Sequence, residues 1–108
     1  MTGSVLEAAL EVGDDGLFAV VVSAGTTNAG VVDDISGVSR VCRERGIWLH
    51  VDGAYGGAAL VAPSARPLFD GIEHADSFVV DPHKWLFAPY DCCALLYREP
   101  VYGADAHS

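Results

Sequence analysis

Four short apolar runs, separated by helix-like or glycine-rich segments, constrain the fold of this chain more than any other feature. The runs are LFAVVVS (17–23), IWLHVD (47–52), SFVVD (77–81) and CCALLYR (92–98). Their length and their content of β-branched residues predict strands, and the unbroken first run is typical of a strand buried on both faces. Strands that alternate with helices predict an α/β fold with a mostly parallel sheet covered on both faces.

The segments between these runs carry helix signals. Ser4 and Glu7 fit a capping box, which predicts a short helix at the start of the chain. A second helix is expected over 33–46, with Asp33 or Asp34 near its start. The remaining segments are the turn-rich loop AGTTNAG, a Gly/Ala stretch over 53–63 expected to be loop with a short helical part, and 65–75, expected to be helical.

Polar residues follow three of the predicted strands. The hydroxyl pair Thr26 and Thr27 comes after the first strand, Asp52 ends the second, and Asp81 ends the third. Lys84, the only lysine of the chain, comes three residues after Asp81. Ligands of parallel sheets bind beyond the carboxyl ends of the strands. We therefore expect these side chains to lie along one functional edge.

A lysine at such an edge can act as a nucleophile. Its ordinary pKa of ~10.4 keeps it charged at neutral pH, but burial lowers the pKa, and the free amine can then condense with an aldehyde. Pyridoxal phosphate is the common biological aldehyde for this purpose, and it needs a carboxylate at its ring nitrogen. Asp52 is a candidate for that carboxylate, and the small residues of DGAYGG after it offer a flat wall for the ring.

Three motifs, in this order and spacing, carry a family resemblance. AGTTNAGVVDD, HVDGAYGG and ADSFVVDPHKW resemble segments of the group II pyridoxal-phosphate-dependent amino-acid decarboxylases, which include the aromatic-amino-acid, glutamate and diaminobutyrate decarboxylases. The resemblance implies a fold-type-I large domain with pyridoxal phosphate as its cofactor. It also implies the decarboxylation of an L-amino acid to an amine.

The resemblance assigns a role to each matching position. It implies that Lys84 is the lysine of the internal aldimine, that Asp52 faces the pyridine nitrogen, and that Ala54 packs on one face of the ring. Lys84 thus counts both as a catalytic and as a cofactor-binding residue.

Three further positions match the family pattern around the cofactor. Thr27 would lie near the lysine and the cofactor, and His83 would orient the phosphate or the lysine; both are candidate catalytic and cofactor-binding residues. Asp81, where relatives often have asparagine, is a candidate cofactor contact whose carboxylate would repel a phosphate unless it is protonated or turned away.

The resemblance also predicts the domain organisation. It runs from about residue 17 to 98, so residues 1–108 are expected to be a single partial domain from the centre of the cofactor-binding large domain. The phosphate-binding loop, the mobile loop with the catalytic tyrosine and the small carboxy-terminal domain of the family are missing from this stretch. We expect little or no turnover by this chain alone, and a homodimer for full-length members.

Composition limits the partners. The formal charge of −9 argues against nucleic acid or an anionic membrane surface. No apolar run approaches the ~20 residues of a membrane span, no leader opens the chain, and three cysteines are not typical of a disulfide framework. These features favour a cytoplasmic protein. A hydrophobic share of 51% in so short a chain indicates a piece of something larger, or one half of an oligomer.

Other interpretations remain open from the sequence. Lys84 can be a surface lysine, Asp52 a turn residue, and Thr27 a hydroxyl that bonds only to its own loop. A metal site of His50, Asp52 and His83 is conceivable, although the spacing matches no known ligand pattern. The chain can also belong to another pyridoxal-phosphate enzyme, such as an aminotransferase or a lyase, or be an inactive fragment or an interaction module. The sequence does not indicate which amino acid is the substrate.

Overall fold

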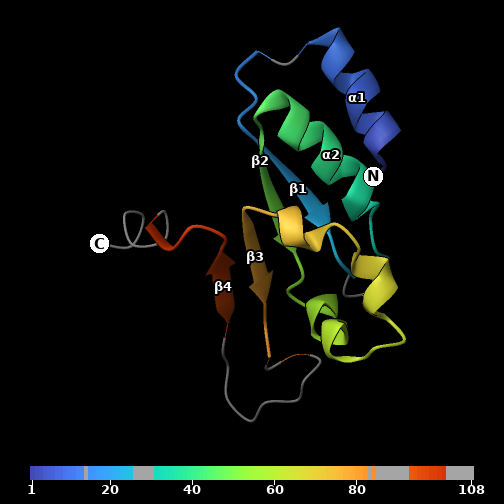
Figure 1. Ribbon diagram of the computed structural model, residues 1–108, viewed down its shortest axis with the longest axis vertical. Coiled ribbons are helices and arrows are strands. Elements are labelled where there is room, and N and C mark those ends of the chain that lie inside the picture. The colour runs from blue at the N-terminus through green and yellow to red at the C-terminus, as the bar shows by residue number, and fades with distance from the viewer. Residues whose placement is uncertain (14, 26–30, 83, 85–92, 102–108) are drawn as a thin grey trace.

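The computed structural model describes residues 1–13, 15–25, 31–82, 84 and 93–101 as one α/β unit (Figure 1). Its two α-helices are α1 (Gly3–Val12) and α2 (Ile35–Arg45), and its four strands are β1 (Ala19–Ser23), β2 (Trp48–Asp52), β3 (Ser77–Val80) and β4 (Ala94–Tyr97). Three short 3-10 helices, η1 (Gly56–Val61), η2 (Arg66–Phe69) and η3 (Ile72–His74), connect β2 to β3. All four expected strands are present, each within its predicted segment.

The four strands form one sheet in the order β1-β2-β3-β4. The first three are parallel, and β4 runs antiparallel to β3 at the edge, so the prediction of a mostly parallel sheet is confirmed. The register aligns the carboxyl ends of the parallel strands. Ser23 pairs with Asp52, and Asp52 pairs with Val79. The polar strand ends therefore meet at one edge of the sheet.

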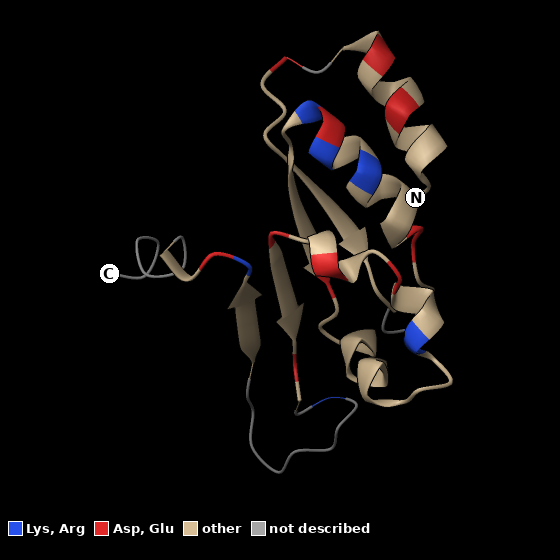
Figure 2. Ribbon diagram, in the orientation of Figure 1, with Lys and Arg blue, Asp and Glu red and all other residues tan. Residues whose placement is uncertain are grey.

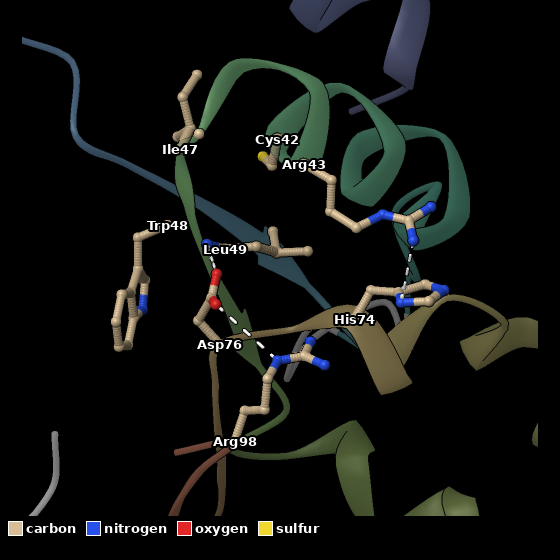
Figure 3. Close-up of a pocket in the computed structure, with 9 residues that line it drawn as sticks. Cys42, Arg43, Ile47, Trp48, Leu49, His74, Asp76 and Arg98 are labelled. Carbon is tan, nitrogen blue, oxygen red and sulfur yellow. Dashed lines mark hydrogen bonds and ion pairs between the residues drawn. The ribbon is translucent and has the colours of Figure 1, made fainter. Parts of the chain in front are cut away.

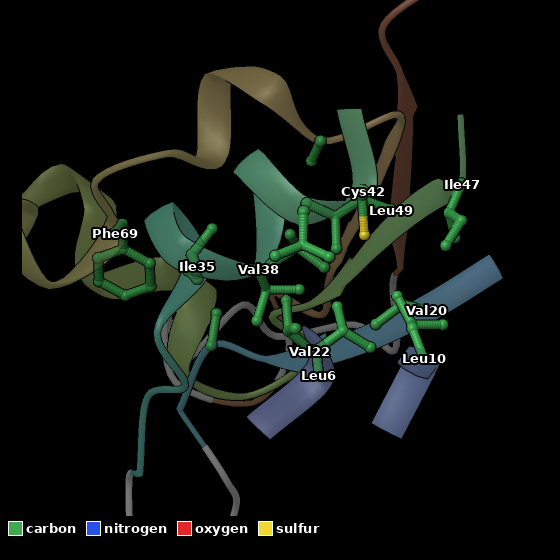
Figure 4. Close-up of a cluster of buried hydrophobic side chains, with 14 residues drawn as sticks. Leu6, Leu10, Val20, Val22, Ile35, Val38, Cys42, Ile47, Leu49 and Phe69 are labelled. Atoms are coloured by element: carbon green, nitrogen blue, oxygen red, sulfur yellow. The ribbon is translucent and has the colours of Figure 1, made fainter. Parts of the chain in front are cut away.

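Among the described residues, helices cover one face of the sheet. The alternate residues Val20 and Val22 of β1 and Leu49 and Val51 of β2 are buried against the inner sides of α1 and α2 (Figure 4). On the opposite face Val21 is 57% exposed. Within the described residues both α-helices pack on the same side, so covering of the second face stays a prediction.

The second helix follows its predicted signals. Asp34 caps its amino end, since the carboxylate accepts a hydrogen bond from the Gly37 N–H at 3.0 Å. Gly46 ends it in the left-handed conformation, with its N–H bonded to the Cys42 carbonyl. Ile35 and Val38 are buried and form part of its inner face.

The first helix differs from its prediction at the cap. Thr2, and not Ser4, is the capping residue, and its hydroxyl accepts a hydrogen bond from the Val5 N–H. Leu6 and Leu10 are the buried members of its apolar stripe, whereas Val5 is 61% exposed. The helix thus begins at Gly3, earlier than the capping-box pattern suggested.

The region before β3 is less regular than expected. Residues 65–75 form the two short helices η2 and η3 in place of one helix. Pro67 lies at the start of η2, where its missing N–H is tolerated, and Gly71 separates η2 from η3 with a φ of 97°. None of the helices in the described part of the chain combines the length and the apolar character needed to cross a membrane.

Candidate functional site at the carboxyl edge of the sheet

The hydrogen-bond ladder of the parallel sheet continues past the strand ends and builds the candidate site. The Gly53 N–H donates to the Val79 carbonyl at 2.9 Å, and the Asp81 N–H donates to the Ala54 carbonyl at 3.0 Å. Two more bonds extend this frame. The Ala54 N–H donates to the Asp52 carboxylate at 3.1 Å, and the Lys84 N–H donates to the Asp81 carbonyl at 3.0 Å. Asp52, Ala54, Asp81 and Lys84 thus belong to one hydrogen-bonded frame.

Asp52 ends β2 with its side chain exposed. One carboxylate oxygen holds the Ala54 N–H, in the short turn that aspartate commonly makes with the backbone two residues on. This contact is the one expected if Asp52 acts as a turn residue, which is the alternative interpretation of its role. The exposure of the side chain still permits a ligand to contact the carboxylate.

Lys84 forms an ion pair with Asp81. The Nζ atom lies 2.9 Å from Asp81 Oδ2, and the side chains are 36% and 14% exposed, respectively. The hydrogen bond that the Lys84 ammonium donates to Asp81 raises the pKa of Lys84. It outweighs the opposing effect of desolvation and is reinforced by the charges of Asp81, Asp52 and Cys93. The expectation that burial lowers the pKa of this lysine is wrong for this structure, because the side chain is exposed and paired.

The glycines after Asp52 allow neighbouring segments to pack closely. A Cβ atom on Gly53 would lie 2.4 Å from the Phe78 ring, and one on Gly56 would lie 2.5 Å from the Gly25 Cα atom. Gly57 makes the same kind of approach to Phe78. The interpretation of this stretch as a flat wall for a ring is therefore only partly supported. Ala54, half-buried, remains the small residue next to Asp52.

Two predicted site residues, Thr27 and His83, lie outside the described residues, as does Thr26. Gly25, which precedes the threonine pair, is described and has a φ of 94°. Its carbonyl accepts a hydrogen bond from the Gly56 N–H at 3.2 Å. The start of the threonine loop is therefore fixed against the turn that follows Asp52.

Ser23 is a further polar residue at this edge that the sequence-based site did not include. It is the last residue of β1 and pairs in register with Asp52. Its backbone is held by Asp33, whose carboxylate accepts the Ser23 N–H at 2.8 Å. The signal available in the sequence was a polar residue at the end of an otherwise apolar run.

The open face of the sheet carries its own polar contacts. The Ser77 hydroxyl lies 2.7 Å from His50 Nδ1 and accepts a hydrogen bond from the Trp48 indole at 3.0 Å. His50 shares its strand face with Asp52, as predicted, but it is engaged by Ser77. Among the described residues no three potential ligands come together to hold a metal ion, and His83 lies outside them.

A cavity of about 390 Å³ lies at the opposite, amino edge of the sheet (Figure 3). Arg43 approaches His74 at 3.4 Å on one side, and Arg98 approaches Asp76 at 4.0 Å on the other. The Asp76 carboxylate also accepts the Leu49 N–H at 2.8 Å. These contacts join α2, β2 and the segments flanking β3 and β4. The cavity therefore lies at the other end of the strands from the predicted site residues.

Charge is distributed unevenly over the structure (Figure 2). The helix α1 carries the acidic residues Glu7 and Glu11 and lies above α2, which carries Arg43 and Arg45 in its last turn. At the carboxyl edge the charges of Asp52 and Asp81 both act on the single lysine. An anionic group that binds at this edge therefore requires positive charge or backbone donors beyond the four residues of the frame.

Comparisons with known proteins relate this chain to one enzyme family. A sequence model described as "Pyridoxal-dependent decarboxylase conserved domain" matches residues 1–105. The aromatic-L-amino-acid decarboxylase of Rattus norvegicus is 46% identical over 101 residues, which covers 83% of this chain and 21% of the rat protein.

Solved structures give the same result. Tryptophan decarboxylase of Catharanthus roseus, in complex with L-tryptophan, superposes with a TM-score of 0.88 at 35% identity, covering 100% of this chain and 24% of that one. The 4-hydroxyphenylacetaldehyde synthase of Rhodiola rosea superposes with a TM-score of 0.85 at 40% identity, covering 94% and 22%. The predicted fold-type-I architecture is thereby confirmed. The chain spans about a fifth of the length of the curated relatives it matches.

Proposed function

The chain belongs to the pyridoxal-dependent decarboxylase family, and on that premise we propose that it forms part of the cofactor-binding domain of an L-amino-acid decarboxylase. The observation that carries the proposal is the hydrogen-bonded frame at the carboxyl edge. It brings Asp52, Ala54, Asp81 and Lys84 together from two neighbouring parallel strands. An amine and a carboxylate at one edge are the two groups that pyridoxal phosphate requires from its protein.

The described residues fit pyridoxal phosphate at its reactive end. When bound, the cofactor supplies an electrophilic carbonyl carbon and a ring that accepts electrons. Lys84 provides the amine that would hold the cofactor, and Asp52 an exposed carboxylate that would keep a proton on the ring nitrogen. Ala54, bonded to both Asp52 and Asp81, would limit how close a ring can approach the backbone.

Three assignments complete the proposal. Thr27 and His83 would contact the cofactor or Lys84, as in the family pattern, and both lie outside the described residues. Asp81 is also kept at the site, with its contact to Lys84 as support. Because the chain spans about a fifth of its relatives, we propose that residues 1–108 are the central part of a larger domain and turn over little or no substrate alone.

A second candidate reaction starts from the same site. The relatives and structural neighbours include aldehyde synthases, such as the phenylacetaldehyde synthase of Petunia hybrida and the Rhodiola rosea protein. Those names indicate an aldehyde product where a decarboxylase yields an amine. Asp52, Ala54 and Lys84 would serve cofactor binding in either case, so the products of the reaction must decide between the two.

A chimeric enzyme tests the proposed function. The matched segment of the rat aromatic-L-amino-acid decarboxylase is replaced by this chain, and release of CO₂, amine and aldehyde from aromatic amino acids is measured. We expect CO₂ and amine in equal amounts, and loss of both in the same chimera with Lys84→Ala. A folded chimera that releases no CO₂, or one whose activity survives Lys84→Ala, would contradict the proposal. Aldehyde in place of amine would favour the second candidate.

The proposal extends to cellular location, subunit number and binding partners. We infer a cytoplasmic homodimer that acts on a small amino acid and binds neither nucleic acid nor membranes. The buried thiol of Cys42 and the net charge of −9 support this setting. Cell fractionation and sedimentation of the protein from its source measure location and subunit number, respectively.

A further inference from the structure

The carboxyl edge of the described structure holds an ion pair of Asp81 and Lys84. Its atoms are 2.9 Å apart, within the range of a charge-assisted hydrogen bond. The two residues are also joined through the backbone, since the Lys84 N–H donates to the Asp81 carbonyl at 3.0 Å. The pair is therefore set by the turn itself, in addition to the attraction of opposite charges.

Asp81 is the more firmly held partner. Its side chain is 14% exposed against 36% for Lys84, and its N–H is bonded to the Ala54 carbonyl at 3.0 Å. The position of Asp81 thus depends on the turn that follows Asp52. Asp81 thereby supplies a carboxylate in a set position beside the more solvent-accessible amine.

Among the described residues, the charges that act on Lys84 favour its protonated form. They belong to Asp81 in its own turn, to Asp52 at the end of β2, and to Cys93 before β4. An ammonium has no lone pair and cannot bond to a carbonyl carbon. Before Lys84 reacts with an aldehyde, its proton must pass to solvent; its nitrogen then bonds to the carbonyl carbon, and the carbonyl oxygen leaves as water.

We propose that Asp81 is the counter-ion that holds Lys84 as an ammonium, so that separation of this pair controls the capture of an aldehyde by Lys84. Asp81 is then a positioning residue that acts through Lys84, and its carboxylate is neutralised by the lysine and not by a bound phosphate. The proposal rests on the proposed function in that it takes Lys84 as the amine that receives the cofactor.

Removing the charge of Asp81 should make Lys84 more reactive at a given pH. Lys84 is the only lysine, so trace acetylation with isotopically labelled acetic anhydride and peptide mass mapping reports on it directly, with the Met1 amine as internal reference. For Asp81→Asn we expect labelling of Lys84 at pH 8 to rise about two- to fivefold, as for loss of an exposed ion pair, and its pH profile to move to lower pH.

Matched variants separate this effect from net charge and from folding. Asp15→Asn removes one exposed negative charge at the amino edge of β1 and should leave labelling of Lys84 unchanged. Asp81→Glu keeps the charge and should restore much of the protection. If Asp81→Asn labels like the unmodified chain, or if Asp15→Asn raises labelling equally, the proposal is overturned.

The salt dependence of Lys84 labelling tests the proposal without a substitution. Raising the ionic strength from 0.1 M to 1 M shortens the Debye length from about 10 Å to about 3 Å, and should increase labelling of Lys84 in the unmodified chain. The increase should be smaller in Asp81→Asn. Should Asp81→Asn fail to fold, as judged by circular dichroism, absence of a salt effect on the unmodified chain still overturns the proposal.

A parallel reaction with pyridoxal phosphate separates failure of the counter-ion role from failure of the proposed function. The chain is incubated with the cofactor over a range of pH, reduced with borohydride and mapped. A change in acetylation with Asp81→Asn, but no cofactor adduct on Lys84 in any variant, leaves the counter-ion role intact and contradicts the proposed function. Adducts on Lys84 whose pH dependence is the same with and without Asp81 contradict the counter-ion role alone.

Discussion

The backbone N–H of Asp81 donates to the carbonyl oxygen of Ala54 at 3.0 Å, and this bond joins the turns that follow β2 and β3. Ala54 in turn donates to the Asp52 carboxylate, and Asp81 accepts from the Lys84 N–H. Residues that are far apart in the sequence thereby acquire fixed relative positions through bonds of the backbone. Such an edge suits a ligand that must meet an amine and a carboxylate at once.

Replacing Asp52 by asparagine tests the role of its charge. The amide oxygen can still accept the Ala54 N–H, so the free energy of unfolding should change little. Loss of a hydrogen bond to a charged group, about 1.5–3 kcal/mol, should weaken binding of pyridoxal phosphate by roughly 10- to 100-fold. Titration followed by visible absorbance measures the affinity. Equal affinity for Asp52→Asn and the unmodified chain would exclude the assigned role.

Gly25 should tolerate no larger residue. Gly25→Ala places a Cβ atom 2.6 Å from the Gly56 Cα atom and keeps a φ of 94° that disfavours alanine. Gly16 is a matched control, because it has a φ of 79° but no atom within 4 Å of the position that a Cβ would take. Gly16→Ala should therefore cost about 1 kcal/mol of unfolding free energy, and Gly25→Ala at least about 2 kcal/mol. Urea denaturation measures both values, and equal costs would show that the close approach is unimportant.

The sheet could be predicted from the sequence because its signals are local. Each parallel strand is a short β-branched run, and each polar residue at a strand end is visible in the chain. Placement of Asp52 and Asp81 at one edge then follows from the parallel arrangement. The signals for the two ends of α2 were also local, since Asp34 and Gly46 are residue types typical of helix boundaries.

The remaining features depend on contacts that single-sequence patterns do not encode. The exposure of Val21 depends on which side of the sheet both α-helices occupy. Gly53 packs against Phe78 from a strand that lies well downstream, so its role in close packing could not be distinguished from that of a ring wall. The pairing of Lys84 with Asp81 depends on side-chain conformation in a turn, where both burial and ion pairing were possible outcomes.

Asp34 should contribute to stability in a pH-dependent manner. Hydrogen bonds from the Gly37 and Gly3 N–H groups lower the pKa of this carboxyl below its ordinary value of 3.8. A carboxyl with a lower pKa in the folded state stabilises the fold above its unfolded pKa, and the contribution is lost as the pH falls below about 4 through the folded value.

The corresponding substitution is Asp34→Ala, which removes the cap of α2 and its bond to the start of α1. At pH 7 we expect a loss of about 1–2 kcal/mol of unfolding free energy, with a smaller loss for Asp34→Asn. The difference between Asp34→Ala and the unmodified chain should shrink on acidification toward pH 3. A constant difference from pH 7 to pH 3 would mean that the charge of Asp34 does not contribute.

The capture of pyridoxal phosphate by Lys84 is the most direct test of the central claim that the carboxyl edge is a cofactor site. The chain is mixed with the cofactor, reduced with borohydride and mapped by peptide mass spectrometry, with Lys84→Arg as the matched control. We predict a reduced adduct on Lys84 that exceeds the adduct on the Met1 amine, and no adduct at position 84 in Lys84→Arg. An adduct confined to Met1, or none at all, would contradict the assignment of this edge as the cofactor site of the chain.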